Sequence, residues 1–181
     1  METFSADQMM IVDHSVAIAE EMVCNYYKMS ANQWLRHRYD VKTLADLAPE
    51  ETVKGPFAQV VRYAGRQHEA FLGSAVYDFY KICLQDNAIL GALRASPILV
   101  LSPFLTYILV HELVHIVRFA KFYQQFHAPP EEKQKEESRV HEITRSILHG
   151  RSITGMANVL DYYAQWRADA QDVADTNENI S

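Results

Sequence analysis

The sequence predicts a mainly α-helical protein that folds as a single domain over residues 1–181. Three observations predict this class: long segments with apolar residues spaced three and four apart, a near absence of strand-like segments, and turn residues between the helical segments. Apolar residues make up 49% of the chain and charged residues 22%, which is typical of a soluble globular protein with one core.

The first half of the chain contains two long helical patterns. One covers residues 6–37, either as a single helix or as two helices that break near Ser30. Turn and cap residues follow, with a short helix expected at 42–48. The second pattern covers residues 56–84, although two internal glycines lower its helical propensity. At most one short strand is expected, near residues 98–101, where the letters ILVL stand between two prolines.

The second half predicts three more helical segments. A helix is expected over 103–126, with Pro103 at its first position, where the missing N–H costs nothing. A pair of prolines ends it, and the next helix covers about 131–148. An amphipathic segment follows at 152–168, and the polar tail from about 169 to 181 is expected to fray.

Charge and cysteine content restrict the partners and the compartment. The formal net charge is -6 and no long basic block is present, so we expect no nucleic-acid partner. Cys24 and Cys83 are far apart in sequence, which favours buried thiols in the cytoplasm. The first residues do not resemble a signal peptide, and the most apolar stretch, 97–110, is shorter than the ~20 residues of a stable membrane span. Oligomerisation is left open.

The letters HELVH at 111–115 are the strongest functional signal in the sequence. Residues at i and i+4 share a helix face, so His111 and His115 can direct two imidazoles at one point. Glu112 lies about 100° around the helix from His111 and can reach the rim of the same site. Zinc hydrolases use this spacing: two imidazoles bind the metal, and the carboxylate takes a proton from the metal-bound water.

The apolar neighbours of the motif strengthen this interpretation. Glu112 is the only charged residue other than histidine between Pro103 and Ile116, so the helix is expected to be buried nearly all round. Buried polar side chains without partners are costly, and a bound metal would give these three side chains a partner.

A zinc site needs a third protein ligand, and the helix predicted at 131–148 offers candidates. Glu136 and Glu137 both lie within or beside its apolar stripe, and Glu137 is our choice. His141 shares a face with Glu137 at i+4, so it could orient a ligand or be the ligand itself.

Residues 103–148 resemble the gluzincin branch of the HExxH zincin metallopeptidases. In that branch two helices supply the zinc ligands, and the third ligand is a glutamate in an ExxxD-like pattern. The matching stretch here begins at Glu137 and ends at His141, which stands where an aspartate is usual. The resemblance implies that His111, His115 and Glu137 bind zinc and that Glu112 is the general base. The sequence does not identify the substrate, which is expected to be a peptide or a small molecule.

Two other functions fit the same residues. A helical-bundle di-iron carboxylate oxidase or hydroxylase would use the ExxH formed by Glu112 and His115, together with acids such as Glu20 and Glu69, and iron in place of zinc. A non-catalytic metal-binding helical domain would need the ligands but not Glu112. In a hydrolase, a tyrosine such as Tyr107 or Tyr162 could also polarise a substrate carbonyl.

Overall fold

The computed structural model describes residues 2–34, 39–66, 76–121 and 128–165, and it confirms the mainly helical class. The helices are α1 (Ala6–Tyr27), α2 (Ala31–Trp34), α3 (Asp86–Ala95), α4 (Leu101–Ala120) and α5 (Pro130–Leu148), followed by a helical segment at 156–165. The strands are β1 (Tyr39–Lys42), β2 (Ala58–Arg66) and β3 (Val76–Leu84), and two short 3-10 helices, Leu44–Asp46 and Pro49–Glu51, lie between β1 and β2.

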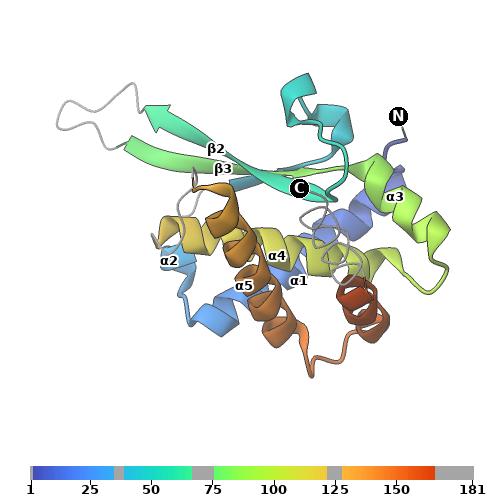
Figure 1. Cartoon of the computed structure of the whole chain (residues 1–181). Helices are drawn as coiled ribbons and strands as arrows, with labels where there is room; N and C mark the ends of the chain where they lie inside the picture. The colour runs from blue at the N-terminus through green and yellow to red at the C-terminus, as the bar shows by residue number, and fades with distance from the viewer. Residues whose placement is uncertain (1, 35–38, 67–75, 122–127, 166–181) are drawn as a thin grey trace, which may run out of the picture.

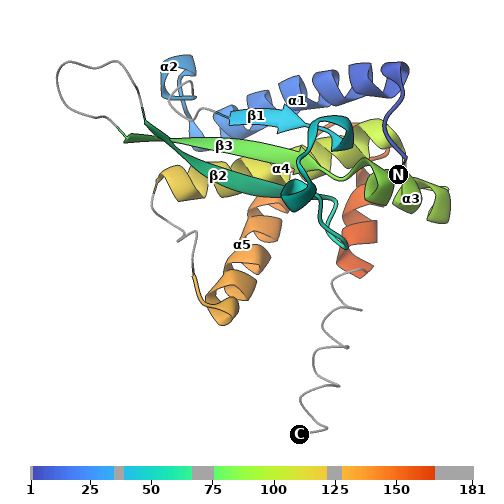
Figure 2. The same cartoon turned by 90° about the horizontal axis from the view of Figure 1, so that it is seen from above.

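The strands form one sheet that lies over a layer of helices (Figure 1). The strand order is β1-β3-β2, with β1 parallel to β3 and β2 antiparallel to it in the register Ala58↔Leu84. From above, α4 lies beneath the sheet, α1 lies on the β1 side and α5 on the β2 side (Figure 2). Strand β2 is therefore an edge strand on the same side as α5.

The helix predicted over 56–84 is wrong, because this segment forms the antiparallel pair β2 and β3. Its apolar residues fit a period of two as well as a helical period. In β3, Tyr80 and Ile82 are buried, whereas Lys81 between them is partly exposed. Residues that are β-branched, such as Val60 and Val61, favour a strand. The pairing of β2 with β3 along nine positions then stabilises the strands over a helix.

The strand predicted near residues 98–101 is also wrong. This stretch is a turn whose last residue, Leu101, begins α4. Ile98 and Val100 are 56% and 55% exposed, so the apolar letters here do not mark a buried strand. Pro97 instead follows the end of α3, and Pro103 lies in the first turn of α4.

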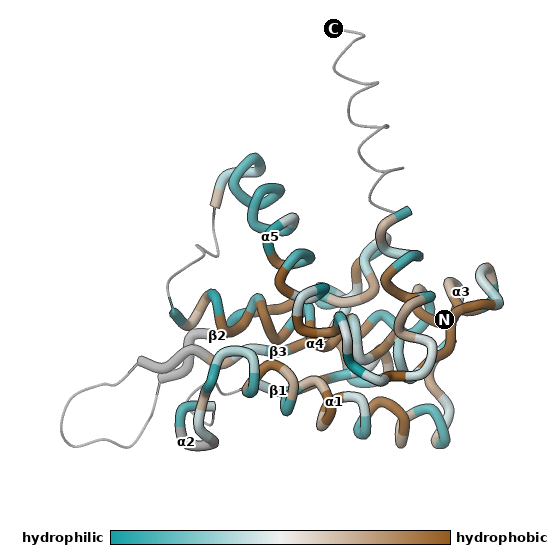
Figure 3. Tube along the Cα trace, turned by 90° about the horizontal axis from the view of Figure 1, so that it is seen from below, coloured by the Kyte–Doolittle hydropathy of each residue, from teal (hydrophilic) through white to brown (hydrophobic). Residues whose placement is uncertain are grey.

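Helix α4 is the centre of the core. All its residues from Pro103 to Arg118 are buried, and its path is mostly hydrophobic, whereas the first half of α5 is hydrophilic (Figure 3). It is long and apolar enough to cross a membrane, but 89% of its apolar stretch is buried inside the fold. That burial is typical of the core helix of a soluble protein.

The first helical pattern takes the two-helix form. Helix α1 ends at Tyr27, and Lys28 follows with a φ of 52°, a left-handed conformation that stops a helix. Helix α2 begins after Ser30. Three predicted stretches lie outside the described residues: the C-terminal end of the helix 103–126, the C-terminal end of the segment 152–168, and the whole tail from 169.

Asp86 ties three distant parts of the chain together. It is fully buried at the start of α3, and its carboxylate accepts hydrogen bonds from the backbone N–H of Phe4 and of Leu44, each at 3.0 Å. The entry to α1 and the segment after β1 are thereby fixed to the end of the sheet.

Replacing Asp86 with alanine should leave both N–H groups without an acceptor. Each unsatisfied buried group costs about 1 to 3 kcal/mol, so we expect the loss of two acceptors in Asp86→Ala to lower the free energy of unfolding by roughly 2 to 6 kcal/mol. Urea unfolding followed by circular dichroism measures this, with the exposed Asp161→Ala as the control. Equal stability of the two variants would contradict the role given to Asp86.

Candidate metal centre

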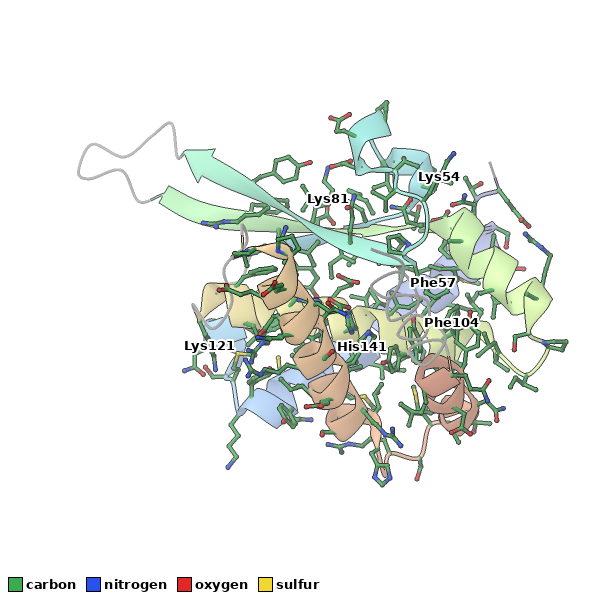
Figure 4. The ribbon with its side chains drawn as sticks, viewed as in Figure 1. Lys54, Phe57, Lys81, Phe104, Lys121 and His141 are labelled. Atoms are coloured by element: carbon green, nitrogen blue, oxygen red, sulfur yellow. The ribbon has the colours of Figure 1, made fainter. Side chains whose placement is uncertain are left out.

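The site forms where α4 and α5 pack beneath β2. Helix α4 presents His111, Glu112 and His115, and α5 presents Glu137 and His141 one helical turn apart. Figure 4 labels His141 on α5. His111 and His115 share a face of α4 because they are four residues apart, as predicted. The two helices thus bring together residues separated by more than twenty positions in the sequence.

The carboxylate of Glu137 meets both histidines of the motif. Its Oε1 lies 2.9 Å from Nε2 of His111, and its Oε2 lies 3.2 Å from Nε2 of His115. The two imidazole nitrogens are themselves 3.2 Å apart. Donors bound to one tetrahedral zinc at about 2.0 to 2.1 Å are separated by roughly 3.3 Å. The three groups therefore already have the spacing of ligands around a single ion.

The nitrogen and oxygen atoms of this cluster face one another. Two protonated nitrogens or two lone pairs would repel each other, whereas one N–H that donates to the other nitrogen makes an ordinary hydrogen bond. A cation between the two nitrogens and the carboxylate would bind all three groups. The Nδ1 of His111 is buried and has no hydrogen-bond partner among the described residues.

Glu137 is held in its ionised form. Burial alone would raise the pKa of its carboxyl, but hydrogen bonds and charge from His111 and His115 outweigh it, so the pKa is far below its ordinary value. An ionised carboxylate is the form that binds a metal. The side chain remains 49% exposed, so the cluster is open to solvent on this side.

Glu112 is buried beside the cluster and lines the same pocket as His111 and Glu137. Burial raises the pKa of its carboxyl, the two histidines oppose that shift, and Glu137 adds to it. Glu112 therefore shares the pocket of the donor group but is not among the three residues whose ligand atoms lie within 4.8 Å of one another.

His141 belongs to the donor group. Its ligand atoms, with those of His111 and Glu137, all lie within 4.8 Å of one another, and the three residues could hold a metal ion. The ring is buried, and its Nδ1 is 2.8 Å from the hydroxyl of Tyr107 on α4.

Glu136, the alternative third ligand, points away from the cluster. Its carboxylate pairs with Arg118, a buried residue of α4, and lies 3.4 Å from Arg139. One position along a helix rotates a side chain by about 100°, which is why Glu137 reaches the histidines and Glu136 does not.

The di-iron alternative would need further acids beside Glu112, His115, Glu137 and His141. Glu20 accepts hydrogen bonds from Trp34 and Tyr39, near the start of β1. Glu69 lies outside the described residues, and among those described the group of His111, Glu137 and His141 is the one found that could hold a metal.

Tyr163, which sequence reasoning did not single out, also lines the site. It comes from the helical segment 156–165, and its ring stacks on that of Tyr107 with centroids 3.9 Å apart. Burial raises the pKa of its hydroxyl, and the charges of Tyr107 and Glu112 add to this. The predicted candidate Tyr162 instead packs against Phe104. Helical spacing alone does not distinguish two adjacent tyrosines.

Two adjoining pockets open over the donor group, and β2 forms one wall of both. The first is lined by Phe57, Tyr107 and Tyr163 together with His111, Glu112, Glu137 and His141. The second lies along the strand and is lined by Ala58, Gln59 and Val60 on one side and Phe119 and Lys133 on the other. An edge strand therefore runs directly beside the candidate metal centre.

Comparison with protein-family models, with curated proteins and with solved structures finds no match. The site must therefore be interpreted from its own geometry.

Binding of a divalent ion should stabilise the fold, because the donors on α4 and those on α5 meet only when the two helices are packed. At an ion concentration about 1,000 times Kd the gain is about 4 kcal/mol, which for a chain of this length raises Tm by roughly 10 °C. Differential scanning fluorimetry with Zn²⁺ and with EDTA measures the shift.

The His115→Ala variant should show little of this shift, whereas His149→Ala, at the exposed end of α5, should keep all of it. A wild-type protein whose Tm is the same with Zn²⁺ and with EDTA would contradict a metal centre at this position.

Proposed function

We propose that the protein is a zinc-dependent hydrolase of the metallopeptidase type, in which His111, His115 and Glu137 bind Zn²⁺ and Glu112 is the general base. The observation that carries this proposal is that His111, His115 and Glu137, the buried Glu112 and the edge strand β2 all line one pocket. A purely structural metal site would need neither the carboxylate nor the strand.

The donor set suits zinc. Imidazole nitrogen and carboxylate oxygen are ordinary zinc ligands, and the separations of 2.9 to 3.2 Å among the three donors fit tetrahedral bonds. When bound, the metal would lower the pKa of a water molecule toward ~7 and polarise a substrate carbonyl. The same donors also accept iron, so the metal itself is part of the proposal.

Glu112 would accept the proton of the attacking water and pass it to the leaving group. It sits one residue from His111, so its carboxylate is at the rim of the donor group without occupying a ligand position. Tyr107 and Tyr163 line the same pocket and could donate a hydrogen bond to the developing oxyanion.

Strand β2 supports a peptide as the substrate. Gln85 N–H donates to the carbonyl of Phe57 at 2.8 Å, so Phe57 and every second residue after it point their backbone groups toward β3. By the same alternation, the N–H and C=O of Ala58 and Val60 point to the free edge, beside the pocket that these residues line. An extended peptide could pair with them by strand addition.

A cytoplasmic location remains part of the proposal. Both cysteines are free, and the burial of α4 is that of a soluble protein.

The Glu112→Gln variant should keep the metal and lose catalysis. Removing a general base costs about 100- to 10,000-fold in rate, so we expect kcat for internally quenched peptides of mixed sequence to fall by that amount. Metal content by mass spectrometry should stay at the wild-type value.

Glu142→Gln is the matched control, because Glu142 is an exposed residue of α5. Peptide cleavage that survives in Glu112→Gln at the rate of this control would rule out Glu112 as the base.

The Val60→Pro variant tests strand addition. Proline removes the outward-facing N–H of Val60 and leaves the hydrogen bonds between β2 and β3 intact, so kcat/KM for peptides should fall about tenfold or more. Val60→Thr keeps both the N–H and the side-chain shape and should behave as wild type. If Val60→Pro retains its metal and its Tm yet cleaves peptides normally, the substrate does not pair with β2.

A further inference from the structure

We propose that His141 is a fourth protein ligand, so that the site offers the metal three imidazoles and one carboxylate. This inference concerns the donor set and rests only on the metal-binding part of the proposed function. The gluzincin pattern has an aspartate at the matching position, whereas the geometry here points to coordination by the histidine.

The first argument is the position of the Nε2 atom of His141. It lies 3.4 Å from Oε1 of Glu137, the same oxygen that lies 2.9 Å from Nε2 of His111. A separation of 3.4 Å is long for an N–H···O hydrogen bond, whose usual range is about 2.7 to 3.2 Å. It agrees with the roughly 3.3 Å that separates two donors on one tetrahedral ion.

The second argument is the contact made by the other ring nitrogen. Nδ1 of His141 lies 2.8 Å from the hydroxyl oxygen of Tyr107, a good hydrogen-bond distance. When Nδ1–H donates to this oxygen, Nε2 carries a lone pair and faces the donor group. Metal-binding histidines usually have such a partner on the second nitrogen, which fixes the tautomer and the direction of the ring.

The third argument is that the ring has little freedom to turn away. His141 is buried, its ring lies 4.4 Å from that of His111 between centroids, and Tyr107 is itself stacked on Tyr163 at 3.9 Å. An aspartate at this position would be shorter than histidine and would not bring a neutral nitrogen to the same point. Its contacts with His111 and Tyr107 of α4 therefore hold the His141 ring in the position of a ligand.

The consequence concerns the open coordination position of the proposed hydrolase. The ligand atoms of His111, Glu137 and His141 lie within 4.8 Å of one another, and His115 meets the other oxygen of Glu137. If all four bind the ion, a water molecule or substrate would enter only if the coordination expands to five or if His141 moves aside. Tyr107 would then act as a positioning residue that favours the bound form of His141.

The test compares wild type, His141→Gln and Tyr107→Phe, loaded with Zn²⁺ or with Co²⁺. Glutamine keeps a polar group next to Tyr107, and Tm of each apo-protein shows whether the variants fold. X-ray absorption on the zinc forms counts imidazole ligands, visible absorption of the cobalt forms reports coordination number, and competition with a chelating dye gives affinity.

We expect three imidazoles in wild type and in Tyr107→Phe but two in His141→Gln, with a changed cobalt spectrum. Zinc affinity should fall about 10- to 100-fold in Tyr107→Phe, as for loss of an orienting partner, and further in His141→Gln. His149→Gln, an exposed histidine at the end of α5, is the control and should match wild type.

Two imidazoles in wild type, or a cobalt spectrum that His141→Gln leaves unchanged, would overturn the inference. The outcome is separable from the proposed function. Three imidazoles in a protein that cleaves no peptide would support the ligand set and refute the hydrolase, whereas two imidazoles in an active peptidase would do the reverse.

Discussion

The structure depends on one constraint: α4 is a core helix that nonetheless carries two histidines and a glutamate. These three side chains are buried, and each must find a partner or raise the free energy of the fold. Helix α5 supplies a partner for the two histidines, because Glu137 reaches both of their Nε2 atoms. The way α5 packs on α4 is thus tied to the chemistry of the site.

The sheet meets a second requirement of the same helix. An apolar helix that is buried all round needs cover on several sides, and α1, α5 and the sheet provide it. Tyr80 of β3 stacks on Phe119 near the end of α4, and Phe57 packs on Phe104 near its beginning. Because β2 is the outermost strand on the α5 side, this cover also places a free strand edge beside the donor group.

Sequence reasoning failed where a pattern supported two periods. The segment that forms β2 and β3 has apolar residues at spacings that also fit a helix. The pairing of its two halves with each other is a contact that the local pattern does not show. Among the acids of α5, the apolar stripe allowed both Glu136 and Glu137. The choice between them came from Arg118, which pairs with Glu136 across the helix interface and which no local pattern connects to it.

The sequence by itself determined the mainly helical class, the motif helix and the residues that can act as ligands, because these follow from spacing along a single helix and from the apolar flanks of HELVH. Only the tertiary structure decided that Glu137 meets His111 and His115, that His141 joins them beside Tyr107, and that Tyr163 and β2 line the pocket. The physical reason is that periodicity fixes which side chains share a face, whereas the facing partner depends on how separate elements pack.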